Sequence, residues 1–132
     1  MLRTLIVDDN ASFRQSFRDH LYQQFPEMII EEAASAEEAI ENIGSSAPHL
    51  VFVDIQLPGE NGLELTRKIR AGHVRVTIAI LTAYDLPEYR DAANECGANF
   101  FLSKGAYSME EIISVVDTVL FERQRQGESE IP

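Results

Sequence analysis

The sequence of 132 residues predicts one α/β domain, a doubly wound parallel sheet of five strands in the order 2-1-3-4-5 with five helices. Two observations predict it. Five short apolar runs alternate with five longer segments of helical periodicity, the pattern of repeated β–α units. The first, third and fourth runs are apolar throughout, as strands buried on both faces are, whereas polar residues adjoin the second and fifth. Right-handed crossovers with those two strands at the edges give the stated order.

The first strand is predicted at residues 5–7, Leu-Ile-Val. The segment after it has an apolar residue at every fourth position, which predicts a helix with one buried stripe: Phe13, Phe17, Leu21 and Phe25. Pro26 cannot continue this helix and ends it. The second strand, residues 28–30, runs into Glu31 and Glu32, which indicates an edge of the sheet.

The second helix is predicted to begin with a capping box, in which the side chains of Ser35 and Glu38 bond backbone N–H groups of the first turn. Gly44 is predicted to end this helix. The third strand is the apolar run at residues 50–53. The predicted buried face of the second helix is Ala39, Ile40 and Ile43.

The third helix is predicted over residues 63–69, ending near Gly72. The fourth strand follows at residues 76–81. Pro87 suits the first position of the fourth helix, because its missing N–H has no partner to lose there. Gly97 is predicted to close that helix, because glycine accepts the left-handed conformation common at helix ends.

The fifth strand is predicted at residues 100–102, and the flanking polar residues Asn99 and Ser103 indicate the second edge. A second capping box, formed by Ser108 and Glu111, begins the last helix. Its predicted buried residues are Ile112, Val115, Val116, Val119 and Leu120.

Composition and charge exclude several classes of protein. Asp and Glu total 22 against 11 Lys and Arg, so the net charge is -11 and binding of nucleic acid or an anionic membrane surface by the whole chain is not expected. The single cysteine, Cys96, allows no internal disulfide. Since no apolar run has membrane-spanning or signal-peptide character, a soluble, cytoplasmic protein is predicted. Residues 1–121 are predicted to form the domain and residues 122–132 a polar tail or the start of a linker.

Three carboxylates follow strands that lie side by side in the predicted sheet. Asp8 and Asp9 come directly after the first strand, and Asp54 directly after the third. In this strand order the carboxyl ends of the first and third strands lie side by side, at the point where the strand order reverses. Ligands bind at this point in open α/β sheets. Crowded like charges need compensation, and Mg²⁺ prefers oxygen ligands, so the sequence predicts a magnesium site. A turn and helix cap formed by Asp8, Asp9 and Asn10 would explain one of the paired acids but would not explain Asp54.

Two further polar residues end strands at the same edge. Thr82 follows the fourth strand and offers a hydroxyl to an oxyanion. Lys104 follows the fifth strand and offers a compact positive charge to a phosphoryl oxygen. Each alone is better explained by a structural role, Thr82 as a threonine at a strand end and Lys104 as a solvated loop lysine. Together with the three acids they predict a single site for phosphoryl transfer.

With these residues the sequence resembles the receiver domains of two-component response regulators, a flavodoxin-like, chemotaxis-regulator-like family. The resemblance spans residues 2–120 and depends on Leu-Ile-Val-Asp-Asp-Asn at 5–10, Val-Asp-Ile-Gln-Leu-Pro at 53–58 with Gly62, Leu-Thr-Ala at 81–83, and the segment 97–104. Many receivers have proline after the lysine, where this chain has Gly105, so the usual cis peptide is not expected. In this respect the chain is more similar to receivers attached to helix-turn-helix output domains.

The resemblance implies that Asp54 is the phosphoacceptor, taking a phosphoryl group from a phosphohistidine. It implies that Asp9, Asp54 and the backbone carbonyl of Gln56 bind Mg²⁺, with Asp8 acting through a metal-bound water. Lys104 would contact Asp54 or the phosphoryl group. The protein would be a phosphoacceptor rather than an enzyme, with at most self-phosphorylation and autodephosphorylation activity.

The resemblance also implies a switch. Thr82 would bond the phosphoryl oxygen after transfer, and Phe101, three residues before the lysine, would rotate inward as Thr82 moves. Packing of Phe101 in the core beside Phe100 is the alternative. Gln56 and Tyr84, two residues after the acceptor and after Thr82, hold positions that tune the lifetime of the phosphorylated state.

The implied partners are a sensor histidine kinase or phosphotransfer protein, and an output domain or downstream protein on the face of the fourth helix, fifth strand and fifth helix. Two copies could also pair through that face. One alternative is a pseudo-receiver that binds partners without phosphorylation. An aspartyl-nucleophile phosphohydrolase would instead have its second aspartate two residues after the first, unlike the adjacent Asp8 and Asp9. A flavodoxin-like cofactor binder would need a Ser/Thr/Gly-rich loop after the first strand, where this chain has acids.

Overall fold

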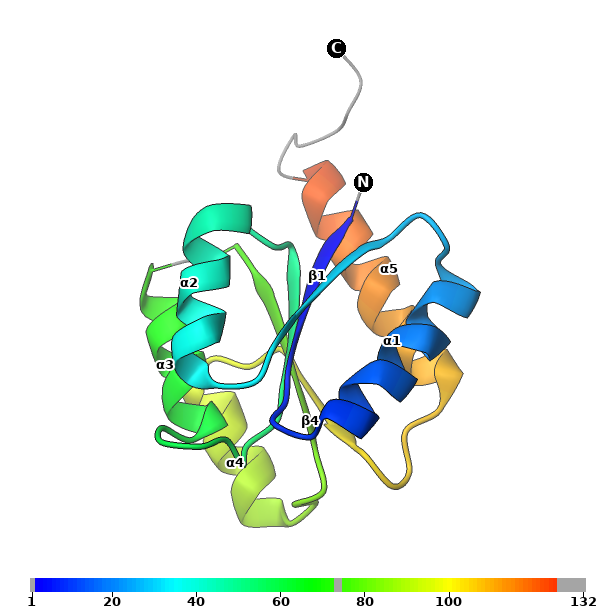
Figure 1. The fold of residues 1–132 in the computed structure, drawn as a ribbon. Coiled ribbons are helices and arrows are strands. Elements are labelled where there is room, and N and C mark those ends of the chain that lie inside the picture. Colours follow the sequence, from blue (N-terminus) through cyan, green and yellow to red (C-terminus); the bar gives the residue numbers. More distant parts are fainter. Residues whose placement is uncertain (1, 73–74, 126–132) are drawn as a thin grey trace.

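The computed structural model describes residues 2–72 and 75–125 and shows a five-stranded parallel sheet in the order β2-β1-β3-β4-β5 (Figure 1). The predicted fold class, strand order and edge strands are confirmed. The elements alternate along the chain: β1 (Arg3–Val7), α1 (Ala11–Gln24), β2 (Ile29–Ala33), α2 (Ala36–Ser46), β3 (Leu50–Val53), α3 (Gly62–Gly72), β4 (Thr77–Thr82), α4 (Pro87–Cys96), β5 (Phe100–Ser103) and α5 (Met109–Arg125).

Helices cover both faces of the sheet, and each face has its own apolar core (Figure 1). Helices α2, α3 and α4 pack on one face, where Leu5 and Val7 of β1 point. Helices α1 and α5 pack on the other, where the alternate residue Ile6 points. Because both faces are buried, β3 and the central residues of β1 and β4 need apolar side chains, which is why these strands contain unbroken apolar runs.

The register of the sheet aligns the carboxyl ends of its central strands. Val7 pairs with Val53, and Val53 pairs with Ile80, so the residues that follow β1 and β3 emerge at the same level. The backbone N–H of Asp54 then donates to the carbonyl of Val7 at 3.0 Å. On the other side, the N–H of Lys104 donates to the carbonyl of Thr82 at 2.9 Å. These bonds bring the predicted site residues to one edge.

Side-chain caps begin four of the helices, among them α3, where Asn61 accepts from the N–H of Glu64 at 2.9 Å. Asn10 caps α1 by accepting from the N–H of Phe13 at 3.0 Å. Ser35 accepts from the N–H of Glu38 at 3.2 Å, and Ser108 accepts from the N–H of Glu111 at 3.1 Å. Both predicted caps are therefore confirmed, and each fixes the direction in which the chain leaves the preceding strand.

The structure corrects the predicted end of α2. The helix passes through Gly44 to Ser46 and ends at Ala47, which takes the left-handed conformation at φ 48°. The N–H of Ala47 bonds the carbonyl of Ile43 at 3.2 Å, which closes the last turn one residue beyond the helix. Gly44 is a helical residue, so the prediction that it stops the helix was wrong.

Three further sequence expectations differ from the structure. Strand β2 includes Glu31 and Glu32 and runs to Ala33, because an edge strand can turn polar side chains away from the core. Ile40 and Leu120 were predicted to be buried but are 44% and 43% exposed. Each residue lies beside the buried stripe of its helix. That stripe contains fewer residues than the apolar pattern of the sequence predicts.

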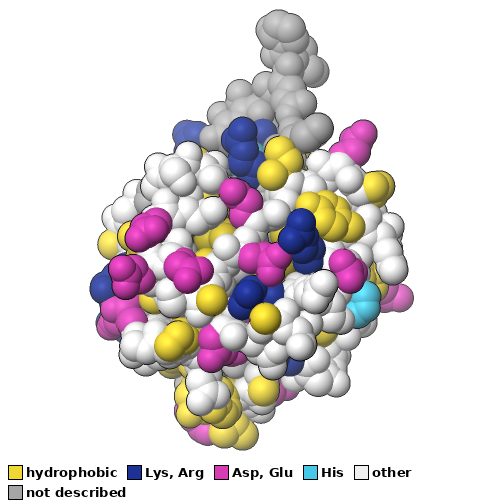
Figure 2. Space-filling view, viewed as in Figure 1, with side chains coloured by type: hydrophobic (Ala, Val, Ile, Leu, Met, Phe, Trp, Pro, Cys, Tyr) yellow, Lys and Arg dark blue, Asp and Glu magenta, His cyan; other side chains and the backbone are white. Residues whose placement is uncertain are grey.

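Helix α5 continues to Arg125, so the predicted domain boundary at residue 121 falls inside a helix. The remaining predicted tail, residues 126–132, lies outside the described residues. No helix in the described ranges is long and apolar enough to cross a lipid bilayer. Figure 2 shows Asp and Glu side chains spread over the visible face, and apolar side chains gathered at the lower edge near the start of α4.

Candidate functional site

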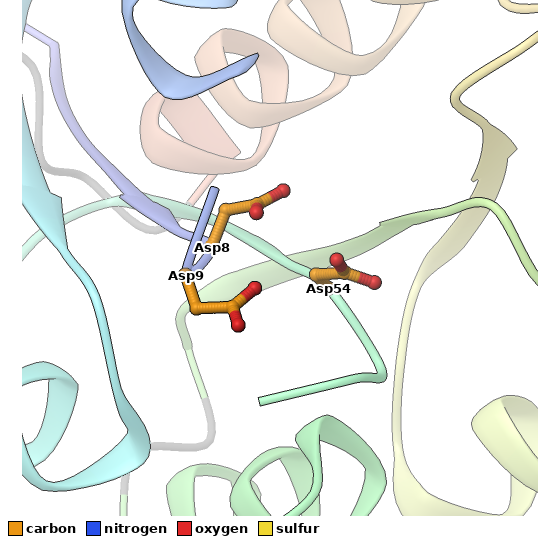
Figure 3. A group of neighbouring side chains, drawn as sticks. All are labelled: Asp8, Asp9 and Asp54. Atoms are coloured by element: carbon orange, nitrogen blue, oxygen red, sulfur yellow. The ribbon is translucent and has the colours of Figure 1, made fainter. Parts of the chain in front are cut away.

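Three carboxylates meet at the carboxyl ends of β1 and β3 (Figure 3). One carboxylate oxygen from each of Asp8, Asp9 and Asp54 can be chosen so that all three lie within 4.8 Å of one another. Asp8 is 1% exposed and Asp54 is 6% exposed, whereas Asp9 is exposed to solvent. The three acids meet at the strand ends as the sequence predicted, and the structure adds that two are buried and one is exposed.

The ammonium group of Lys104 lies between the two buried acids. Its Nζ is 2.6 Å from Oδ2 of Asp8 and 2.8 Å from Oδ2 of Asp54. Burial by itself lowers the pKa of Lys104, but its hydrogen bonds to Asp54 and Asp8 outweigh burial and raise the pKa above its usual value. Lys104 is thus held in its charged form.

Burial is also the largest influence on the pKa of the Asp8 carboxyl. Loss of solvent raises the pKa of the Asp8 carboxyl above its usual value, although the bond from Lys104 and the N–H of Asn10 at 2.8 Å both oppose this change. The negative charge on Asp8 is therefore costly in this structure. A further cation close to Asp8 would stabilise the ionised form.

Thr82 already contacts the predicted acceptor. Its Oγ1 donates to Oδ1 of Asp54 at 2.7 Å, and the N–H of Gln56 donates to the same oxygen at 3.3 Å. Lys104 donates to the other carboxylate oxygen, so both oxygens of Asp54 are held in place. These bonds hold the Asp54 carboxylate in one orientation.

Gly62, part of the motif quoted in the sequence, lies against the backbone of Asp54. A Cβ at this position would lie 2.0 Å from the Asp54 carbonyl oxygen and 2.9 Å from Cγ1 of Val53. The N–H of Gly62 donates to the carbonyl of Ile55 at 2.7 Å, which ties the start of α3 to the chain just after Asp54. A side chain is therefore excluded here by close approach.

Phe101 is half-buried on the α2–α4 face, where its ring packs against the core, and the Arg90 guanidinium carbon lies 4.7 Å from the ring centroid. Phe100 packs against the core on the opposite face. Phe101 therefore packs in the core as the alternative expected, but on the face opposite Phe100, because consecutive residues of a strand point to opposite faces. Phe101 shares its face with Ile80, its partner in β4.

Two contacts at the site were not predicted. The hydroxyl of Tyr84 donates to Oε1 of Gln56 at 2.6 Å, so the loops after β3 and β4 are bridged beside Asp54. The ring of Phe13, predicted only as part of a buried stripe, lies 4.4 Å from Nζ of Lys104. Neither contact has a signal in the sequence beyond the presence of an aromatic residue, Tyr84 just after β4 and Phe13 in the first turn of α1.

The loop after Lys104 is closed by backbone bonds. Ala106 and Tyr107 both donate their N–H groups to the carbonyl of Ser103, at 3.2 and 2.9 Å. The described residues contain no cis peptide bond, in agreement with the expectation from Gly105. These bonds fix the direction in which the Lys104 side chain leaves β5.

The sequence model of the response regulator receiver domain matches residues 4–117. The chain belongs to the receiver-domain family of response regulators. The response regulator MprA of Mycolicibacterium vanbaalenii is 33% identical over 119 residues, which cover 90% of this chain and 50% of that protein. The receiver therefore spans about half the length of the curated relatives it matches.

Solved structures agree with this assignment. A two-component response regulator of the LuxR family from Aurantimonas sp. superimposes with a TM-score of 0.81 at 29% identity, covering 89% of this receiver and 84% of that chain. A CheY-like receiver domain protein from Methanospirillum hungatei has the same fold, with a TM-score of 0.84 at 24% identity over 95% and 98% of the two chains. The receiver is a component of two-component signalling, whose general function is phosphorelay.

Proposed function

We propose that this receiver accepts a phosphoryl group on Asp54 from a phosphohistidine of a sensor kinase or phosphotransfer protein. The observation that carries the proposal is the Asp54 carboxylate, 6% exposed and bonded by both Thr82 and Lys104. An aspartate buried only as a structural residue would not need a hydroxyl, an ammonium and two further acids around it.

In the transfer step, an Asp54 carboxylate oxygen attacks phosphorus and forms an acyl phosphate. The phosphorus–nitrogen bond of the donor breaks, and its electron pair returns to the imidazole ring. In phosphoryl transfer, a protein contributes mainly by positioning the reacting groups and by neutralising charge on the phosphoryl oxygens. Lys104 is placed to supply one positive charge, and the Thr82 hydroxyl can supply a hydrogen bond.

Magnesium fits the site, because three carboxylates converge there and burial makes the charge on Asp8 costly. Asp9 and Asp54 would hold Mg²⁺ together with the backbone carbonyl of Gln56, and Asp8 would act through a bound water. When bound, the ion would neutralise charge on the phosphoryl group. Asp9→Ala should weaken Mg²⁺ binding, which a titration measures.

After transfer, Thr82 would leave the Asp54 carboxylate for a phosphoryl oxygen, and Phe101 would turn inward. This motion would change the face formed by α4, β5 and α5, which would bind an output domain, a downstream protein or a second copy. The two-fold greater length of the MprA relatives supports an output domain joined to a receiver of this kind. The cytoplasmic location and any self-phosphorylation or autodephosphorylation activity remain part of this proposal.

The test is intact mass after incubation with acetyl phosphate, with and without Mg²⁺, beside Asp54→Asn. One Mg²⁺-dependent phosphoryl adduct, absent in the variant, is the expected result. An adduct that persists in Asp54→Asn would refute the acceptor assignment. No adduct in either protein, from acetyl phosphate or from a histidine kinase, would favour a pseudo-receiver, and steady turnover of a small phosphate ester would favour a phosphohydrolase.

A further inference from the structure

The ring of Phe13 on α1 faces the ammonium group of Lys104, with 4.4 Å between Nζ and the ring centroid. This separation is well within the range of cation–π attraction. We propose that Phe13 is a positioning residue for phosphoryl transfer, whose ring face holds the Lys104 ammonium between Asp8 and Asp54. The inference deepens the proposed function, because it depends on the role of Lys104 in neutralising phosphoryl charge.

The bonds of the ammonium group leave room for this role. A lysine ammonium has three N–H donors, and the two carboxylates accept at 2.6 and 2.8 Å. The flexible side chain of Lys104 could reach those acids in several rotamers. The face of the Phe13 ring, beside the ammonium group, favours the Lys104 rotamer that points into the site. The side chain is only 17% exposed, so the attraction is weakened little by water.

The ring of Phe13 is itself fixed. It stacks on Phe17 with 5.8 Å between centroids and 10° between planes. Phe17 is 1% exposed and meets Phe52 and Tyr107 edge to face, at 4.9 and 5.6 Å. Phe52 precedes Asp54 by two residues, and Tyr107 follows Lys104 by three.

This aromatic cluster therefore joins α1 to the strand that carries the acceptor and to the loop that carries the lysine. Phe17 contacts three other rings, and it keeps its orientation better than a ring in an aliphatic core would, because aromatic pairs have preferred angles. The Phe13 ring stacks on this fixed neighbour. The geometry at Lys104 thus depends on α1, whose Arg14 also donates to the backbone carbonyl of Asp8.

The test separates electrostatics from packing. Fluorine on a phenylalanine ring withdraws electron density from the face and weakens cation–π attraction with little change in size. Phe13 is replaced in the full chain by phenylalanine with one, two and three ring fluorines, and the same series at Phe17 is the control. The readout is the rate of Mg²⁺-dependent uptake from acetyl phosphate, followed by intact mass.

The expected result is a stepwise fall in rate at Phe13, reaching roughly three- to tenfold with three fluorines, and no graded fall at Phe17. Phe13→Tyr should keep the rate of uptake, because its ring face is retained. Phe13→Leu should lower the rate at least as far as three fluorines do, because it has no ring. A flat series at Phe13, or an equal graded loss at Phe17, would overturn the proposal.

A second readout does not depend on phosphoryl uptake. The ring current of Phe13 should shift the NMR signals of the Lys104 Hε protons upfield, and Phe13→Leu should abolish that shift while Phe13→Tyr preserves it. Unchanged Lys104 signals in Phe13→Leu would refute the contact. Failure of the unmodified chain to take up phosphate would instead refute the proposed function, and the NMR result would still decide whether the ring holds the ammonium.

Discussion

Gly62 approaches Asp54 so closely that a Cβ would lie 2.0 Å from the Asp54 carbonyl oxygen. The start of α3 and the residue proposed to take the phosphoryl group are thus in backbone contact. The contact leaves no flexible atom to move aside, because the neighbouring atoms are backbone and the buried Val53. The geometry of the acceptor therefore depends on a residue that has no side chain.

Gly62→Ala is expected to destabilise the receiver by about 1–3 kcal/mol, because overpacking at a backbone contact forces the chain to shift. The shift displaces Asp54, so the rate of phosphoryl uptake should fall as well. Urea unfolding measures the first effect and intact mass the second.

Gly44→Ala is the matched control. Gly44 lies within α2, and a Cβ added there would meet nothing within 4 Å, so alanine should stabilise the protein by roughly 0.5–1 kcal/mol through helix propensity. Equal stability of Gly62→Ala and the unmodified chain would contradict the argument from close approach.

Lys104→Ala is expected to lower stability by about 1–3 kcal/mol at pH 7, because it leaves Asp8 and Asp54 buried without their cation. Burial already raises the pKa of Asp8, and loss of the ammonium should raise it further. Protonation of Asp8 then relieves the repulsion, so the deficit should shrink as the pH falls.

Added Mg²⁺ should also reduce the deficit of Lys104→Ala, because a cation among the carboxylates replaces part of the lost charge. Lys68→Ala is the control, since Lys68 pairs with Glu60 on an exposed helix surface. Chemical denaturation at several pH values and Mg²⁺ concentrations makes the comparison. A deficit that ignores both pH and Mg²⁺ would argue against charge as its cause.

Glu32 on the edge strand holds two arginines of α1, with Arg14 at 2.9 Å and Arg18 at 2.7 Å. Burial acts to raise the pKa of Glu32, but the bonds from Arg14 and Arg18 prevail and lower the pKa below its usual value. A lowered folded-state pKa contributes stability that is present above the unfolded value and lost as the pH falls through the folded value.

Glu32→Gln should therefore cost roughly 0.5–1 kcal/mol at pH 7, and the cost should vanish in acid below the folded pKa of Glu32. The unfolding free energy measured from about pH 7 down to about pH 3 gives the profile, since that range spans the ordinary pKa of a glutamate. Glu31→Gln removes the same charge from the neighbouring position and tests whether net charge alone is responsible. A cost for Glu32→Gln that stays constant down to the acid end of this range would count against the ion pairs.

The polar residues at strand ends were predictable because a parallel sheet brings those ends together. Asp8, Asp54, Thr82 and Lys104 meet as the strand order requires. The capping boxes were predictable because their bonds are local. The end of α2 at Ala47 was not, since nothing in the sequence favours a left-handed alanine over a helical Gly44.

Contacts made by side chains within helices were not predictable from the sequence. Phe13 has the spacing of a core stripe, and only the packing of α1 shows that its ring faces Lys104. Ile40 and Leu120 have the same helical spacing as their buried neighbours, yet both are exposed. Helical periodicity shows which side of a helix faces the core. It does not show how wide a stripe of that side is buried.

Tyr84 and Gln56 bridge the two loops beside the acceptor through a hydrogen bond of 2.6 Å. The N–H of Tyr84 also bonds Oγ1 of Thr82 at 3.3 Å, which links the bridge to the proposed switch. If Asp54 carries the acyl phosphate proposed above, we expect a closed bridge to restrict the approach of water to it. Tyr84→Phe removes only the hydroxyl and should open the bridge between Tyr84 and Gln56.

We therefore expect Tyr84→Phe to shorten the lifetime of the phosphorylated state by roughly two- to fivefold, the size that one hydrogen bond at a partly exposed site supports. Decay of the phosphoryl adduct after removal of acetyl phosphate, followed by intact mass, gives the lifetime. Gln56→Ala should have a similar effect, and the double variant should add little, because both changes break the same bond. Tyr89→Phe is the control, since Tyr89 contacts the Tyr84 ring at 5.5 Å without forming the bridge. An unchanged lifetime in Tyr84→Phe, or strictly additive effects in the double variant, would show that the bridge does not control hydrolysis.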